Sequence, residues 1–94
     1  MLFASASASG KDAKVPICSR PPITELKQAI CWGKYHVTKV SPEFDLLKMK
    51  AEAKLQNEVW SVWLIPANVQ MAGGGATLAI RKDNGELLEL WWNQ

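Results

Sequence analysis

The stretch LKMKAEAKL (residues 47–55) decides the fold, because apolar and charged side chains alternate in it without a break. Alternation with a period of two places the apolar side chains on one face of a β-strand and the polar side chains on the other. Ala, Glu, Lys and Leu also favour helices, but at 100° per residue the apolar set scatters around a helix axis. The stretch therefore predicts an amphipathic strand.

Strands and turns continue to the end of the chain. Asn57-Glu58 indicates a tight turn into a run rich in β-branched and aromatic residues, and Asn84-Gly85 favours a tight hairpin because it accepts positive φ angles. Short connections between strands imply antiparallel pairing. The predicted strands span 46–56, 59–65, 76–81 and 86–92.

One helix precedes these strands. Apolar residues recur at steps of three and four over residues 23–37, which is the spacing of one helix face. Pro21-Pro22 suits a helix start, and Ser41-Pro42 ends the pattern. The order of elements predicts an α+β fold, in which one N-terminal helix packs on a four-stranded antiparallel sheet in a cone-like shape. We expect residues 15–94 to form this single domain.

Residues 1–14 stand apart in composition. Ala and Ser alternate from Ala4 to Ser9, and this pattern offers overlapping A-x-A sites of the kind that signal peptidase accepts. Two interpretations remain open, a flexible leader and the remnant of an export signal. We expect an exported or periplasmic protein, with the cytoplasm as the alternative. No run approaches the roughly 20 apolar residues of a membrane-spanning helix, so we expect no integral membrane segment.

The net positive charge of the chain comes from its first 20 residues. Residues 1–20 carry a balance of +2, whereas residues 21–94 hold eight basic and eight acidic side chains. A neutral domain has no electrostatic basis for binding a polyanion. The composition therefore argues against a nucleic-acid partner.

Catalytic and metal-binding patterns are weak in this sequence. His36 is the one histidine, and two cysteines with one histidine fall short of a structural zinc site. No nucleophile-elbow, zinc-protease, P-loop or dinucleotide-binding motif occurs. We therefore expect a protein that is not an enzyme and that uses no cofactor and no metal. His36 itself is expected on the surface or at a helix end.

Cys18 and Cys31 are separated by twelve residues, one in the Pro-rich lead-in and one on the predicted helix. In an oxidising compartment they could pair, and a loop of this length would contribute about 3 kcal/mol in the chain-entropy model. The alternative is two small buried side chains. We expect the two Cα atoms to lie within about 7 Å of each other.

The tryptophans are the strongest functional signal, and strand parity divides them. Trp60 is expected in the core, and so is Trp92, together with Leu88 and Leu90 on its face. Trp63 and Trp91 are expected on the face opposite the helix, where exposed aromatics usually mark a partner surface. The candidate site combines these two tryptophans with Asn68, Gln70, Gly73, Gly74 and Gly75 of the following loop. For the glycines, the alternative is a tight bend or a close backbone approach.

The second half of the chain resembles a known family. VWSVWLIP (59–66), the Gly-Gly loop and GGGATLAIRKDNGELLELWW (73–92) are similar to bacterial immunity proteins with a nuclear transport factor 2 fold. The upstream helix with Ala29 and Trp32 belongs to the same resemblance. The double Trp near the end, the triple glycine and the long leader depart from the family pattern. A weaker resemblance connects the Trp strand and its hairpin with peptidase-propeptide-like domains.

The first resemblance implies a non-enzymatic binding protein that neutralises a cognate bacterial toxin by direct contact. The second implies an exported module that binds a small ligand or a protease. A homodimer that packs sheet against sheet is a further interpretation of the same tryptophan surface. A toxin inhibitor would form a stoichiometric protein complex, whereas a ligand-binding cone would enclose an apolar pocket.

Overall fold

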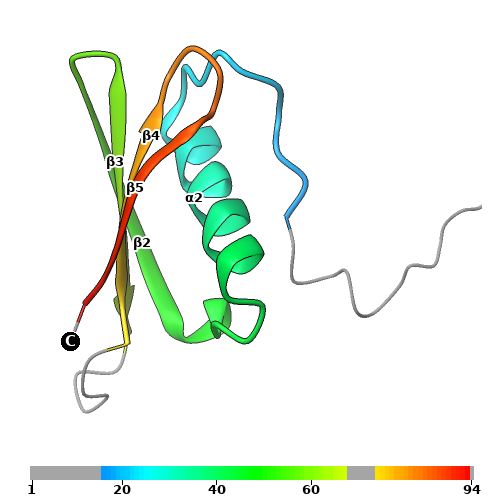
Figure 1. Ribbon diagram of the computed structural model, residues 1–94, viewed down its shortest axis with the longest axis vertical. Coiled ribbons are helices and arrows are strands. Elements are labelled where there is room, and N and C mark those ends of the chain that lie inside the picture. The colour runs from blue at the N-terminus through cyan, green and yellow to red at the C-terminus, as the bar shows by residue number, and fades with distance from the viewer. Residues whose placement is uncertain (1–15, 68–73, 94) are drawn as a thin grey trace, which may run out of the picture.

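A computed structural model describes residues 16–67 and 74–93, which form one helix packed on one face of a four-stranded antiparallel sheet (Figure 1). The predicted α+β class is therefore confirmed. The elements are α2 (Leu26–Val40), the 3₁₀ turn η1 (Leu46–Lys48), β2 (Met49–Gln56), β3 (Val59–Pro66), β4 (Ala76–Arg81) and β5 (Leu87–Trp92).

The strands lie in the sheet in the order in which they occur along the chain, β2-β3-β4-β5. Every neighbouring pair is antiparallel, as the short connections predicted. The first strand begins later than predicted, because residues 46–48 form the 3₁₀ turn. The Asp45 carboxylate caps this turn by accepting a hydrogen bond from the Leu47 amide at 3.2 Å, and Leu47 is left 97% exposed.

Helix α2 is shifted by three residues from the predicted range of 23–37. Both backbone groups of Ile23 bond to residues of the sheet region. Its amide donates to the Lys82 carbonyl at 2.8 Å, and its carbonyl accepts from the Trp60 indole at 2.8 Å. These bonds hold the chain extended, so that Glu25 has φ −125° and ψ 151° and the helix starts after it. The helix ends at Val40, three residues beyond the predicted end, and Ser41-Pro42 follows it directly.

The core lies between α2 and the sheet. The inner face of the sheet contributes alternate residues of β3 and β4, and the helix and the segment before it close the core from the other side. Gly33 sets the distance between the two layers, since a Cβ at this position would lie 2.6 Å from Cγ1 of Val62. The buried apolar residues are Ile23, Ala29, Val37, Trp60, Val62, Leu64, Ala76, Leu78 and Ile80.

The two hairpin turns differ in length. Asn57 (φ 54°) and Glu58 (φ 65°) form the predicted two-residue turn, with positive φ at both central positions. The turn at Asn84-Gly85 is longer than predicted, because only Gly85 has a positive φ, at 76°. The Gly85 amide bonds the Arg81 carbonyl at 2.9 Å, and Asn84 Oδ1 accepts from the Glu86 amide at 2.9 Å.

The last strand departs from simple parity. A register shift between Ala79 and Ile80 places Leu87 opposite Ile80 and Leu90 opposite Leu78. Leu87 and Leu90 therefore pack against the core, and Leu88 is exposed, in contrast to the expectation that it shares the inner face.

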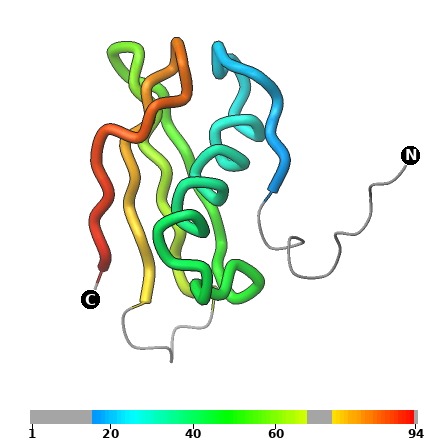
Figure 2. Tube along the Cα trace, turned by 45° about the vertical axis from the view of Figure 1, so that its right-hand side comes forward, coloured from blue at the N-terminus to red at the C-terminus, as the bar shows by residue number. Residues whose placement is uncertain are grey.

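Helix α2 covers β2, β3 and β4 and leaves β5 at the open edge (Figure 2). Trp92 lies opposite Ala76 and so belongs to the inner face, as predicted from parity. It is nonetheless 45% exposed, and the expectation of a core position was wrong. The helix is too narrow to bury the inner side of all four strands. The Phe44 ring packs near this indole, at 5.8 Å between centroids.

Candidate functional site

The sheet face turned away from α2 carries the two tryptophans that the sequence singled out. Trp63 on β3 is paired with Thr77 on β4, and Thr77 is paired with Trp91 on β5. Side chains of directly paired antiparallel residues point to the same face of a sheet. Trp63 and Trp91 therefore lie on one face and in one row, as the parity of the strands predicted.

This outer face is apolar at its centre and charged along one edge. Trp91 is 52% exposed and Trp63 is half-buried. On β2 the same face carries Lys50, Glu52 and Lys54, all exposed, and Glu52 is paired with Trp63. An indole surface bordered by charges resembles the composition of protein interfaces, in which aromatic anchors are surrounded by a polar rim.

The loop predicted to complete this site is described only in part. Asn68, Gln70 and Gly73 lie outside the described residues. Gly75 is buried, and a Cβ on it would lie 2.6 Å from the Leu64 carbonyl oxygen, so this glycine permits a close backbone approach. Gly74 has φ +87°, and its amide donates to the Asn93 carbonyl at 3.2 Å. For these two glycines the structure agrees with the backbone interpretation.

The lead-in to α2 is tied to the helix by a disulfide. Cys18 and Cys31 are bonded, with their Cα atoms 5.7 Å apart, within the predicted 7 Å. The Trp32 indole also donates to the Ser19 carbonyl at 2.9 Å. The lead-in is thus fixed along the N-terminal half of the helix.

Gln28 is a central residue of this region that sequence reasoning missed. Its Nε2 donates to the Arg20 carbonyl at 2.9 Å and to the Pro22 carbonyl at 3.1 Å, and its Oε1 accepts from the Thr24 amide at 2.9 Å. Nε2 also makes a longer contact with the Ser19 carbonyl, at 3.5 Å, so one side-chain amide contacts four backbone groups of a Pro-rich segment that is not part of the sheet. The sequence signal was weak, since a glutamine on a helix usually faces solvent.

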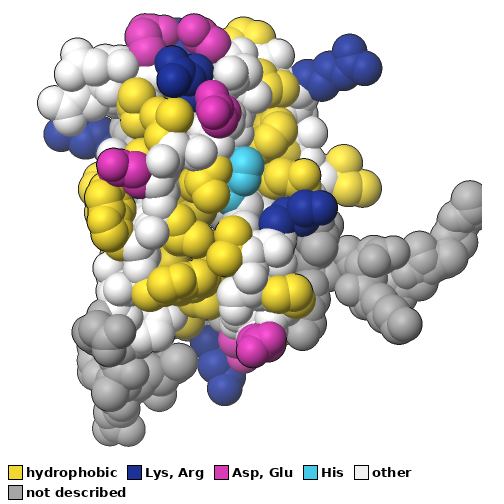
Figure 3. All heavy atoms as spheres, in the orientation of Figure 1, with side chains coloured by type: hydrophobic (Ala, Val, Ile, Leu, Met, Phe, Trp, Pro, Cys, Tyr) yellow, Lys and Arg dark blue, Asp and Glu magenta, His cyan; other side chains and the backbone are white. Residues whose placement is uncertain are grey.

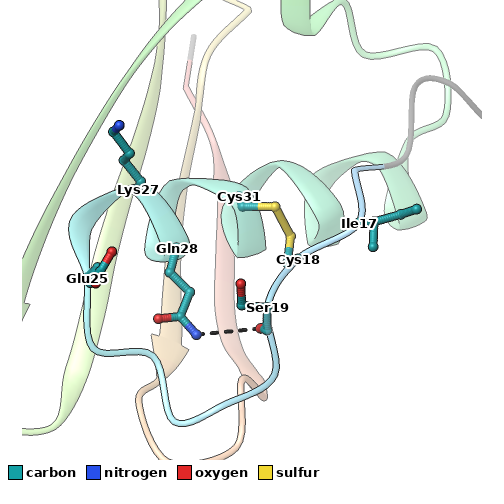
Figure 4. Close-up of a pocket in the computed structure, with 7 residues that line it drawn as sticks. All are labelled: Ile17, Cys18, Ser19, Glu25, Lys27, Gln28 and Cys31. Atoms are coloured by element: carbon teal, nitrogen blue, oxygen red, sulfur yellow. Dashed lines mark hydrogen bonds between the residues drawn. A yellow bond between two sulfur atoms is a disulfide. The ribbon is translucent and has the colours of Figure 1, made fainter.

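A pocket of about 400 Å³ lies between the lead-in and α2 (Figure 4). The disulfide forms one part of its wall, and polar side chains line much of the remainder. No charged side chain in its lining is buried. The lining residues are Ile17, Cys18, Ser19, Glu25, Lys27, Gln28 and Cys31.

His36 occupies a position that differs from the expectation. It lies in the interior of α2 rather than at an end, and it is half-buried, with Nε2 2.7 Å from the Gly85 carbonyl oxygen. Its ring also packs near Trp32 and Tyr35, with centroid distances of 5.8 Å and 5.2 Å. His36 connects the helix to the β4–β5 turn, and this contact joins residues that lie 49 positions apart.

Among residues 16–67 and 74–93, no group of three or more His, Cys, Asp or Glu side chains is arranged to hold a metal ion. Within the same ranges, no helix combines the length and the apolar character needed to cross a membrane. A scan against models of known protein families finds none that matches the chain, and no curated protein or solved structure matches it either.

Proposed function

We propose that this chain is a non-enzymatic binding protein, an immunity protein that neutralises a cognate bacterial toxin by direct contact through the outer face of its sheet. One observation carries the proposal: Trp63 and Trp91 lie in one row on that face. Helix α2 packs on the opposite face of the sheet and does not cover them. The resemblance of about residues 22–94 to immunity proteins suggests the class of partner.

The physical support is the energetic value of tryptophan at an interface. Each indole buries a large area with few rotatable bonds and keeps an N–H donor for a partner. Side chains of this kind at the centre of an interface typically contribute about 2 kcal/mol or more. The charged residues along β2 can provide the polar rim that orients the partner.

The disulfide supports an exported or periplasmic location for the proposed activity. A bond between Cys18 and Cys31 persists in oxidising compartments and is reduced in most cytosols. A toxin that acts in the periplasm, or that is intercepted there, would be accessible to this protein.

The test is neutralisation of the toxin encoded by a neighbouring gene. Growth of cells that express the candidate toxin is compared for the wild type, for the double variant Trp63→Ala, Trp91→Ala, and for Leu47→Ala. Leu47 is an exposed apolar residue on η1, away from the outer face, and serves as the matched control. The double variant should lose protection, and its affinity for the toxin should fall at least about 30-fold, while the control retains both.

Two results would contradict the proposal. In the first, the double variant stays folded and binds the toxin with unchanged affinity, so the outer face is not the interface. In the second, the wild type forms no stoichiometric complex with any neighbouring toxin and instead inhibits a protease or binds a small ligand, as a peptidase-propeptide-like module would.

A further inference from the structure

We propose that β5 pairs antiparallel with β5 of a second copy, extending the sheet from four strands to eight. The two edges of the sheet point to this arrangement. Edge strand β2 (MKAEAKLQ) carries Lys50, Glu52 and Lys54, and charged edges of this kind resist pairing with another strand. Edge strand β5 (LLELWW) carries a single charge, that of Glu89. An apolar edge strand with unpaired backbone groups is a template for strand addition.

The exposed side chains of β5 lie on both faces of the sheet. Trp91 is on the outer face and Trp92 is on the inner face, and each is about half exposed. In the space-filling view, hydrophobic side chains gather over β5 and the adjoining part of α2 (Figure 3). A partner lying flat on one face would leave the other indole in water. A strand added at the edge brings side chains to both faces at once.

A second copy fits this edge because its own β5 is an apolar strand of the same length. A two-fold axis normal to the sheet would set β5 against β5, with Leu90 and Trp92 of each copy on the inner face and Glu89 and Trp91 on the outer face. On the inner side, the Phe44 ring lies next to Trp92 and adds to the apolar surface near the axis.

The available area is consistent with a dimer. The half-exposed indoles of two copies supply roughly 400 Å² of apolar surface. The remaining side chains and the edges of two strands raise the buried total toward the roughly 1,000 Å² that a specific interface needs. This inference does not depend on toxin binding, and the edge pairing leaves Trp63 accessible on the outer face.

The experiment is sedimentation equilibrium of the full chain over a range of concentrations. The wild type should approach twice the 10.4 kDa chain mass. Trp92→Lys should raise the dimer dissociation constant at least about 30-fold. Leu55→Lys is the matched control, since Leu55 is an inner-face residue 39% exposed on the opposite edge, and this variant should dimerise like the wild type.

Further measurements keep the result decisive. If circular dichroism shows that Trp92→Lys is unfolded, Leu88→Lys is used in its place, because Leu88 is an exposed residue of the same strand. Hydrogen exchange should slow at β5 amides as the concentration rises. A wild type that stays monomeric at its highest soluble concentration overturns the proposal. The proposal is also overturned if Trp63→Lys abolishes dimerisation and Trp92→Lys does not. That result would indicate a dimer in which the outer sheet faces pack on each other.

Discussion

Trp60 and Trp91 show how differently the two faces of one sheet use the same residue. Trp60 lies on the inner face, is 5% exposed, and donates its indole N–H to the Ile23 carbonyl. Trp91 lies on the outer face, is 52% exposed, and has no hydrogen bond from its indole to any described residue. The first indole joins the lead-in to the sheet, whereas the second presents its surface to solvent. A tryptophan count therefore does not tell which face of the sheet an indole occupies, whereas strand parity placed Trp60 and Trp91 on the correct faces.

The largest effect on stability is expected at the inner face. Trp60→Ala removes a buried aromatic side chain and leaves the Ile23 carbonyl without its donor. Loss of a buried Trp or Phe typically costs 3–5 kcal/mol, so we expect the free energy of unfolding to fall by about that amount. Urea unfolding followed by circular dichroism measures the change. A loss below about 1 kcal/mol would show that the two faces do not differ as described.

Removal of the disulfide tests whether the packing of Trp60 depends on the lead-in being fixed to the helix. The double variant Cys18→Ser, Cys31→Ser should lower the free energy of unfolding by about 3 kcal/mol in an oxidising buffer. Under reducing conditions the wild type and the variant should have nearly equal midpoints of urea unfolding. The combined fluorescence of the five tryptophans should also shift to longer wavelength if Ile23 separates from the Trp60 indole. Equal stability of the two proteins under oxidising conditions would refute this dependence.

The smallest effect on stability is expected at the outer face. Trp91→Ala should change the free energy of unfolding of the monomer by less than about 0.5 kcal/mol, because surface substitutions outside special features are usually neutral. The measurement is made at low protein concentration, so that self-association does not contribute. A loss as large as that of Trp60→Ala would mean that Trp91 is a structural residue and not part of a binding surface.

The sequence predicted the elements of this fold because their signals are local. Period-two alternation requires only neighbouring residues, so β2 and the inner and outer positions of β3 followed from it directly. The start of α2 did not, since Ile23 is held extended by Lys82 and Trp60, far along the chain. Leu88 was assigned to the inner face because a register shift in β5 leaves no mark in the residue pattern.

The candidate site was less predictable than the fold for the same reason. Parity placed Trp63 and Trp91 on one face correctly, but the exposure of Trp92 depends on how many strands α2 covers, and this is a tertiary property. His36 contacts a backbone carbonyl 49 positions away, and Gln28 bonds carbonyls of the irregular segment before its helix. Their partners, Gly85 and the lead-in, could not be inferred from residue spacing.

The order of the strands has a consequence for folding kinetics. Each described strand pairs only with its neighbours along the chain, in the order β2-β3-β4-β5. Every pair can therefore form as a hairpin, without a partner strand from a distant part of the sequence. Sheets built from local pairs have low contact order, and such chains fold faster than sheets of equal size with crossover connections. A chain that emerges from a ribosome or a translocation channel delivers these strands one at a time, in the order in which the sheet accepts them. Of the four described strands, β5 is delivered after the other three, and no other described strand pairs with its outer edge.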